Sequence, residues 1–153
     1  MPGIHIKRAS AADAERVGEL FDLYRQFYQQ PTDRAGAIDY LRLRLQRGDS
    51  VVLMAMAGEG ELAGFCQLYP TFCSVDMAPI STLYDLYVGS GYRRQGVAGA
   101  LLAAAEDQAR AQGAVRMELA TATDNTSAQR LYEASGWERD RQFLHYSKLL
   151  GAG

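Results

Sequence analysis

The sequence LYDLYVGSGYRRQGVAGALL, which spans residues 83–102, carries the pattern that decides the fold. Its first part is an apolar and aromatic run that predicts a strand ending at Gly89, and its last part predicts a helix that begins near Val97. The turn between them is rich in glycine and holds the pair Arg93 and Arg94. Because the first N–H groups of a helix have no partner within the helix, this turn is suited to bind an anion.

Glycine suits such a turn because a Cβ atom would keep the oxygens of a phosphate away from the backbone amides. Two familiar phosphate-binding patterns do not fit the sequence. Gly91 and Gly96 have the spacing of a P-loop, but Val97 and Ala98 follow where a Lys and a Ser/Thr hydroxyl are required. The dinucleotide-binding pattern requires G-x-G-x-x-G directly after a first strand and repeated βαβ units, and the chain has neither.

The chain before this stretch predicts one strand followed by two helices. His5 and Ile6 predict a short strand, and Ser10 with Asp13 predicts a capping box at the start of a helix. The residues that recur at helical spacing, first as far as Pro31 and then as far as Gly48, are Val17, Leu20, Phe21, Tyr24, Phe27, Tyr28, Ile38, Leu41 and Leu45.

Extended structure is predicted from residue 50 onward. Residues 50–57 and 62–69 are apolar runs separated by Gly-Glu-Gly, which predicts a hairpin. Residues 70–79 mix turn-forming residues with apolar ones, which predicts a surface loop. Residues 82–89 then form the next predicted strand.

After the helix that begins near Val97, Gly113 occupies the place of a left-handed C-cap. Residues 115–121 predict a strand, and Asp124-Asn125 predicts the start of a helix that ends at Gly136. Residues 143–149 are predicted as a last strand. The predicted order is β-α-α-β-β-β-α-β-α-β, a mixed α/β sheet in a single domain over residues 1–153.

Composition restricts the classes of function. The chain is 48% hydrophobic and 22% charged with a net charge of −2. It therefore lacks the basic surface of a nucleic-acid-binding protein. We expect no export signal, and no apolar run is long enough to span a membrane. Cys66 and Cys73 are the only cysteines and are expected as free thiols in the cytoplasm. His5 and His145 share no ligand spacing with each other or with a cysteine, so we expect no metal site.

Two motifs together resemble the GNAT superfamily of N-acetyltransferases. Residues 93–98, RRQGVA, match the Gln/Arg-x-x-Gly-x-Gly/Ala pattern of its pyrophosphate turn. Residues 125–132, NTSAQRLY, followed by Gly136-Trp137, resemble its Asn-x-x-Ala-x-x-Leu-Tyr and Gly-aromatic signature. The resemblance covers nearly the whole chain. It implies a mostly antiparallel, twisted sheet flanked by about four helices, with acetyl-CoA as cosubstrate, and the wording of the motifs is nearest to polyamine and protein-lysine acetyltransferases.

Asn125, Ala128 and Tyr132 are spaced to lie on one face of a helix. The resemblance implies that Asn125 binds the pantetheine arm, that Ala128 leaves room for it, and that Tyr132 lies near the thioester sulfur. It also places backbone amides of residues 87–89 on the cofactor arm and the acetyl carbonyl. The cofactor-binding residues that it implies are Tyr87, Val88, Gly89, Arg93, Arg94, Gln95, Gly96, Val97, Ala98, Gly99, Asn125, Ala128 and Tyr132.

Acetylation of an amine requires two proton movements. A phenol pKa of ~10 lies above a thiol pKa of ~8.5, so full proton transfer from Tyr132 to the leaving thiolate is uphill. Tyr132 therefore either protonates the thiolate or only stabilises it. An alkyl ammonium of pKa ~10.4 is neutral about once in 2,500 molecules at pH 7, so the acceptor needs a base. Asp85 is the first candidate, acting directly or through water, and burial would have to raise its pKa. Glu118 is a weaker candidate, and His145 with Tyr146 is a candidate lining of the acceptor pocket.

The sequence leaves the acceptor open. We expect direct transfer from acetyl-CoA to a primary amine of a small molecule such as a diamine, an amino acid or an antibiotic. A protein lysine or N-terminus is an alternative acceptor, and a transfer through Cys66 or Cys73 lacks a histidine partner in the sequence. A regulatory module that binds CoA without catalysis and an α/β domain of unrelated function are the other hypotheses. Homodimer formation stays open as well.

Overall fold

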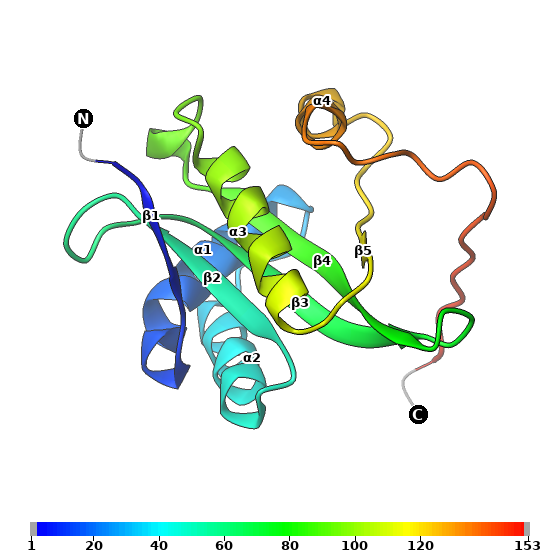
Figure 1. Cartoon of the computed structure of the whole chain (residues 1–153). Coiled ribbons are helices and arrows are strands. Elements are labelled where there is room, and N and C mark those ends of the chain that lie inside the picture. The colour runs from blue at the N-terminus through cyan, green and yellow to red at the C-terminus, as the bar shows by residue number, and fades with distance from the viewer. Residues whose placement is uncertain (1–2, 152–153) are drawn as a thin grey trace. The chain divides into compact units, whose positions relative to one another are not determined.

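The computed structural model describes residues 3–151, which divide into two compact units between Ala120 and Thr121. The elements of the first unit are β1 (His5–Arg8), α1 (Ala14–Phe27), α2 (Arg34–Arg47), β2 (Val51–Met56), β3 (Leu62–Cys73), β4 (Ala78–Val88), α3 (Val97–Ala111) and β5 (Met117–Glu118) (Figure 1). The second unit contains α4 (Thr126–Ala134). The single domain that the sequence predicts stays a prediction.

The five strands form one sheet in the order β1-β2-β3-β4-β5. The first four strands are antiparallel to their neighbours, and β5 is parallel to β4. This mixed, mostly antiparallel sheet with its helices confirms the predicted α/β class. The strand predicted at residues 115–121 is shorter than expected, because only Met117 and Glu118 pair with β4.

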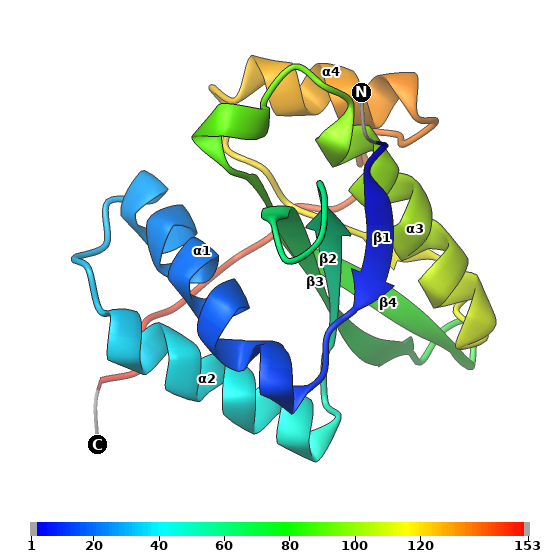
Figure 2. The same ribbon diagram turned by 90° about the vertical axis from the view of Figure 1, so that its left-hand side faces the viewer.

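Helices cover both faces of this sheet, with α1 and α2 on one side and α3 on the other (Figure 2). The two helices of the first side approach closely at Gly18, where a Cβ atom would lie 2.5 Å from Cγ1 of Ile38. Under them, the rings of Phe21 and Phe65 meet edge to face at a centroid distance of 6.1 Å. The buried residues of this core are Ala9, Val17, Leu20, Phe21, Ala37, Leu41, Val52, Met54, Met56 and Phe65.

Several predicted starts and ends of helices are confirmed in their local geometry, whereas α1 ends at Phe27, before the predicted stop at Pro31. The capping box is present, and the N–H of Ser10 donates to Oδ2 of Asp13 over 2.8 Å. Gly48, Gly113 and Gly136 follow helices with φ values of 67°, 81° and 90°. These values lie in the left-handed region that glycine adopts without strain. Such helix ends are the signals that local sequence specifies best.

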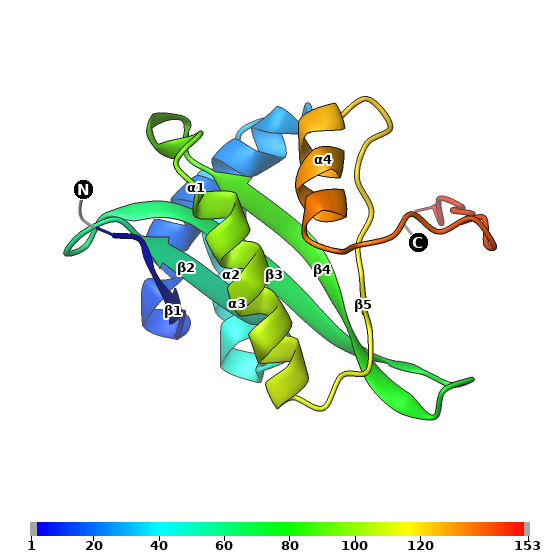
Figure 3. The same ribbon diagram turned by 45° about the horizontal axis from the view of Figure 1, so that its top comes forward.

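The surface loop predicted at residues 70–79 is wrong. Strands β3 and β4 continue through this segment and leave only residues 74–77 as the connection, so the two strands extend together beyond the end of β2 (Figure 3). Beyond Leu68, β3 pairs with β4 alone, and Pro70 therefore lies where one edge of the strand is open. Proline is tolerated at such an edge because its missing N–H removes no hydrogen bond from the sheet.

The strand predicted at residues 143–149 is also wrong, since no strand is assigned there. Apolar and aromatic residues favour extended backbone, but a strand also requires a neighbour that satisfies its N–H and C=O groups. Within the described part of the chain, these residues pair with no strand, and Phe143, Leu144 and Tyr146 are 71%, 82% and 90% exposed. Among residues 3–151, no helix is both long enough and apolar enough to cross a bilayer.

Candidate functional site

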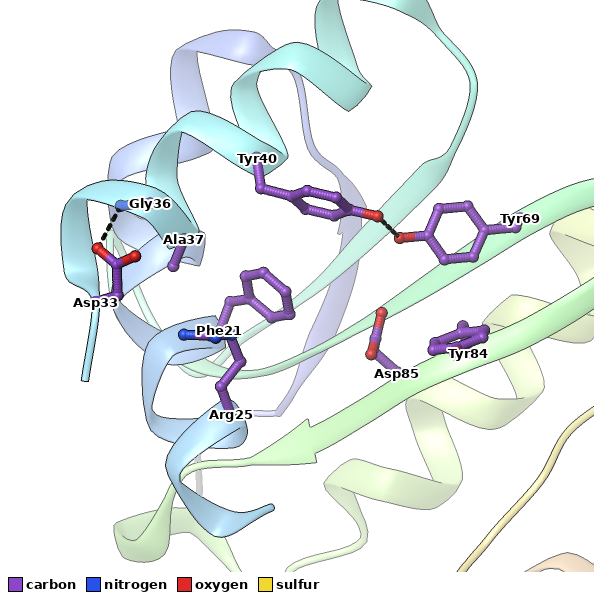
Figure 4. Close-up of a pocket in the computed structure, with 9 residues that line it drawn as sticks. All are labelled: Phe21, Arg25, Asp33, Gly36, Ala37, Tyr40, Tyr69, Tyr84 and Asp85. Atoms are coloured by element: carbon purple, nitrogen blue, oxygen red, sulfur yellow. Dashed lines mark hydrogen bonds between the residues drawn. The ribbon is translucent and has the colours of Figure 1, made fainter. Parts of the chain in front are cut away.

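A cavity of about 320 Å³ lies beside α1, the start of α2 and the strands β3 and β4 (Figure 4). Four aromatic rings contribute to its wall, and its ionisable side chains include two carboxylates and one guanidinium. The lining residues are Phe21, Arg25, Asp33, Gly36, Ala37, Tyr40, Tyr69, Tyr84 and Asp85. An apolar wall with a few charged groups is typical of a small-molecule site.

Asp85 is the most buried carboxylate of this wall, with 5% of its surface exposed. Nε2 of Gln67 donates a hydrogen bond to its Oδ2 over 2.8 Å, and the hydroxyl of Tyr24, which donates to the backbone carbonyl of Tyr84 over 3.4 Å, lies near the same carboxylate. Burial raises the pKa of Asp85 above the ordinary aspartate value, while Gln67 and Tyr24 act in the opposite direction. A carboxylate with a raised pKa is a stronger base than an ordinary aspartate.

A β-bulge places two consecutive side chains of β4 on the same cavity. Gln67 pairs with Asp85 and Leu68 pairs with Leu83, so Tyr84 is an extra residue with no partner on β3. Neighbouring residues of a regular strand point to opposite faces. The bulge allows both Tyr84 and Asp85 to line the cavity, as Figure 4 shows.

Phenol groups surround the carboxylate of Asp85. The hydroxyls of Tyr40 and Tyr69 are 2.6 Å apart and link α2 to β3, and the ring of Tyr84 meets that of Tyr69 edge to face at 5.5 Å. Burial raises the pKa of Tyr69 and of Tyr24, so both phenols stay protonated at neutral pH. A buried carboxylate among neutral aromatic rings is an environment that favours an organic cation.

The rim of the cavity at α2 is held by the buried Asp22. Its carboxylate accepts hydrogen bonds from the Thr32 hydroxyl over 2.6 Å and from the Asp33 N–H over 2.8 Å. The Asp33 side chain in turn accepts from the N–H of Gly36 over 3.0 Å and caps α2. Asp22 therefore fixes the connection between α1 and α2, which carries Asp33 of the cavity wall.

We predict that Asp22→Ala lowers the free energy of unfolding by roughly 1–3 kcal/mol, because the donors of Thr32 and Asp33 lose their partner. These donors hold the pKa of Asp22 below its ordinary value. The contribution of Asp22 is therefore complete above about pH 4 and is lost as the pH falls further. Urea unfolding at pH 7 and at pH 3 measures both effects. Asp39→Ala on the exposed side of α2 is the matched control, and an equal loss in the two variants would contradict the role of Asp22.

The glycine-rich turn, residues 89–99, has the geometry of an anion site. The first hydrogen bond of α3 joins the N–H of Ala100 to the carbonyl of Gly96 over 3.0 Å, so the N–H groups of residues 97–99 precede the helical pattern. Gly96 has a φ of 80°. No heavy atom lies within 4 Å of a Cβ atom built on Gly96 or Gly99, so the space beside the backbone is open to a phosphate.

The side chains of this turn divide between structural contacts and exposed charge. Arg93 turns back on β4, where its Nε donates to the carbonyl of Val88 over 3.2 Å and its guanidinium lies 5.6 Å from the ring centroid of Tyr87. Arg94 is exposed. The N–H of Gly89 donates to the carbonyl of Ala63 over 2.8 Å, so this predicted amide donor is engaged within the fold.

In the second unit, α4 brings three predicted residues onto one helix. Oδ1 of Asn125 accepts from the N–H of Ala128 over 3.3 Å and caps the helix, as the sequence predicts for its start. The ring of Tyr132 lies 6.1 Å from that of Trp137. His145 and Tyr146 are exposed in the segment where the last strand was predicted.

Three other residues considered for catalysis, Glu118, Cys66 and Cys73, do not line the cavity. Glu118 is exposed and accepts a hydrogen bond from Nε of Arg116 over 3.0 Å. Cys66 is fully buried, and burial raises the pKa of its thiol to about 12. This disfavours the thiolate that a transfer through cysteine requires. Cys73 is partly buried at the end of β3. In the described range 3–151, no three His, Cys, Asp or Glu residues are placed to hold a metal ion together.

The model of the acetyltransferase (GNAT) family matches residues 17–137, which include the cavity wall, the glycine-rich turn and α4. The chain belongs to the GNAT family. It is therefore an N-acetyltransferase that uses acetyl-CoA. The fold and the family agree with the resemblance that the two sequence motifs carry.

Several related proteins are similar to this chain over different shares of its length. An uncharacterized N-acetyltransferase of Bacillus subtilis, YhfO, is 44% identical over 143 residues, which cover 94% of this chain and 95% of that protein. An aminoglycoside N(6')-acetyltransferase of Serratia marcescens is 32% identical over 64% of this chain and 69% of its own. A crystal structure of a probable acetyltransferase superposes with a TM-score of 0.91 at 37% identity, covering 97% of this chain and 99% of that one.

Proposed function

We propose that this GNAT enzyme transfers the acetyl group directly to a primary amine of a small molecule that binds in the cavity beside Asp85. The observation that carries the proposal is the buried Asp85 carboxylate facing a cavity of about 320 Å³ with aromatic walls. An ammonium group gains a charge partner there, and its apolar body gains contact with aromatic rings. The volume lies at the lower end of the range for small-molecule sites, which favours a small acceptor over a protein segment.

Acetyl-CoA fits the glycine-rich turn and, when bound, supplies the activated acetyl group. The N–H groups of Val97, Ala98 and Gly99 are the proposed donors to its pyrophosphate, because they precede the helical hydrogen bonds and face open space at Gly96 and Gly99. The exposed Arg94 adds positive charge near the same turn. The proposed remaining contacts, from the backbone of Tyr87 and Val88 and from Asn125 and Ala128, rest on the sequence resemblance, whereas the N–H of Gly89 is already bonded to Ala63.

Asp85 and Tyr132 have separate proton roles in this proposal. Asp85 first holds the acceptor ammonium and then takes its proton, directly or through water, so that the neutral amine becomes a nucleophile. Its raised pKa brings its basicity closer to that of the amine than an ordinary aspartate would be. Tyr132 is proposed to donate a hydrogen bond or a proton to the leaving sulfur. No covalent intermediate on the enzyme is needed.

The names of two relatives support a small-molecule acceptor. One is the aminoglycoside acetyltransferase described above. The other is a mycothiol acetyltransferase of Kineococcus radiotolerans, which is 38% identical over 69% of this chain and 33% of its own length. A protein lysine or N-terminus remains the alternative that the wording of the motifs favours. The presence of Asp85 and Tyr132 argues against a CoA-binding module without catalysis.

A panel of amines tests the proposal through the release of free CoA. The panel contains diamines, amino acids, aminoglycosides, arylalkylamines and lysine peptides, each with acetyl-CoA at neutral pH. We expect release with one of the small amines and none with the peptides. Release with peptides alone would support the protein-acceptor alternative, and no release with any amine would support the regulatory module.

The glycine-rich turn provides a prediction for acetyl-CoA binding. Gly96→Ala is expected to raise the Kd for acetyl-CoA about tenfold or more, because a Cβ atom enters the space beside the amides and the φ of 80° becomes strained. Gly113→Ala is the matched control, since Gly113 has a φ of 81° at the other end of α3. Calorimetric titration of both variants measures the effect. Equal Kd values for the two variants would contradict pyrophosphate binding at this turn.

A further inference from the structure

Three buried polar side chains form a chain of hydrogen bonds that crosses the sheet behind the cavity. The Ser50 hydroxyl donates to Oε1 of Gln67 over 2.9 Å, and Nε2 of Gln67 donates to Oδ2 of Asp85 over 2.8 Å. Ser50, Gln67 and Asp85 are 2%, 0% and 5% exposed. Ser50 immediately precedes β2, while Gln67 and Asp85 are directly paired residues of β3 and β4.

Gln67 is an unusual choice for its position. It follows Phe65 on the same face of β3, where the core is otherwise apolar, and an aliphatic side chain would fill this space without the cost of burying an amide. That cost is offset only when both ends of the amide are hydrogen-bonded. Both ends are, and one of the two partners is Asp85.

The donor-to-acceptor direction of these hydrogen bonds decides which protonation state of Asp85 they stabilise. Because the carbonyl oxygen of Gln67 accepts from Ser50, the NH₂ group of Gln67 faces the carboxylate. The reversed amide would place its oxygen against a carboxylate oxygen, which repels an ionised Asp85. The ionised Asp85 therefore selects this orientation of Gln67, and the Ser50 hydroxyl, which can donate or accept, satisfies the other end of the amide by donating to its oxygen.

We infer that Gln67, whose amide oxygen is held by Ser50, is a positioning residue that holds Asp85 in place as an ionised base. The inference rests on the proposed function, in which Asp85 takes the proton of the acceptor. Without the NH₂ donor, a carboxyl group at this depth would keep its proton to a higher pH. The hydrogen bonds of Ser50 and Gln67 keep the carboxylate ionised and able to accept a proton, while burial raises its pKa and so its basicity.

Other groups around Asp85 bear on its titration. From α1, the Tyr24 hydroxyl lies near the carboxyl and acts to lower its pKa, and Arg25 lines the same cavity. Asp33, at the start of α2, and Tyr40, within α2, also line the cavity. The charge of Asp85 acts on Tyr69 of β3 as well and raises the pKa of its phenol. The thiol of Cys66 is neutral and buried on the same strand as Gln67. None of these groups is altered by a change at Gln67.

Gln67→Met tests the inference, because methionine has a similar length and shape but lacks the NH₂ donor. The measurement is kcat/KM as a function of pH with an amine from the panel. We expect the acid limb of the profile to move to higher pH by about one unit, which lowers kcat/KM about tenfold below the limb and leaves activity to recover at alkaline pH. Ser50→Ala is expected to move the limb in the same direction by a smaller amount.

Two controls separate this role from a loss of stability. Cys66→Ala changes the next buried residue of β3 and is expected to lower the melting temperature without moving the acid limb. Stabilisation by acetyl-CoA in a thermal shift assay shows that each variant is folded and binds its cosubstrate. An acid limb that stays in place in Gln67→Met would overturn the inference.

The double variant distinguishes the inference from the proposed function. In an Asp85→Asn background, Gln67→Met is expected to cause no further shift of the pH profile, because the group that it acts on has been removed. A shift that persists in this background would overturn the role of Gln67. Full turnover in Asp85→Asn alone would instead overturn the assignment of Asp85 as the base.

Discussion

Asp85→Asn is expected to lower turnover by a factor on the order of 10² to 10⁴ while acetyl-CoA binding persists. Asparagine has the shape of aspartate, and its carbonyl oxygen can still accept the hydrogen bond from Gln67. It cannot take a proton from the acceptor ammonium. Release of CoA at saturating amine measures turnover, and calorimetric titration with acetyl-CoA shows that the glycine-rich turn is intact. Unchanged turnover would contradict the role of Asp85.

The same variant is expected to be more stable than the wild type at neutral pH. Burial raises the pKa of Asp85 in the folded state, so the folded state binds a proton more tightly than the unfolded state does. The stability from this group is complete below the unfolded pKa of about 3.9 and is lost as the pH rises through the folded pKa. The asparagine side chain has no charge to bury, so the melting temperature of the variant should rise relative to the wild type at pH 8 but not at pH 4.

Tyr132→Phe is expected to lower turnover by a factor on the order of 10² to 10⁴ with little change in acetyl-CoA binding. Phenylalanine keeps the ring that lies 6.1 Å from Trp137 and removes only the hydroxyl that is proposed to act on the leaving sulfur. Single-turnover release of CoA, measured with the small amine found in the panel, isolates this step.

Trp137→Phe is the control for packing around Tyr132. It alters the neighbouring ring and leaves the hydroxyl in place, so it should reduce stability more than it reduces turnover. A loss of turnover in Trp137→Phe that equals the loss in Tyr132→Phe would show that ring packing, and not the hydroxyl, supports the reaction. Full turnover in Tyr132→Phe would remove Tyr132 from the mechanism.

The sequence predicts those parts of the protein in which neighbouring residues decide the structure. The helix ends at Gly48, Gly113 and Gly136 depend on local backbone conformation, and so does the glycine-rich turn at Gly96. Asp85 was predictable as a buried carboxylate because a lone acid in an apolar strand is conspicuous. These features need no knowledge of which strands become neighbours.

The rest of the site depends on pairing between distant segments. Gln67 acquires its role only when β3 lies beside β4 in one register, and Tyr40 meets Tyr69 only once α2 covers the sheet. The same dependence explains the errors outside the site. Residues 70–79 form strands because β3 and β4 pair there. Residues 143–149 form none, because an extended segment without a neighbouring strand leaves its backbone groups without partners.

The β-bulge in β4 separates acceptor selectivity from the chemistry of the base. Leu83 and Asp85 pair with the consecutive residues Leu68 and Gln67 of β3, so their side chains point to opposite faces of the sheet as neighbours in a regular strand do. Tyr84 is an extra residue between them. Tyr84 is 66% exposed, so a change of its side chain alters the cavity wall while the buried hydrogen bond from Gln67 to Asp85 stays in place. In the proposed mechanism, the shape of the acceptor pocket can therefore change at Tyr84 independently of the base.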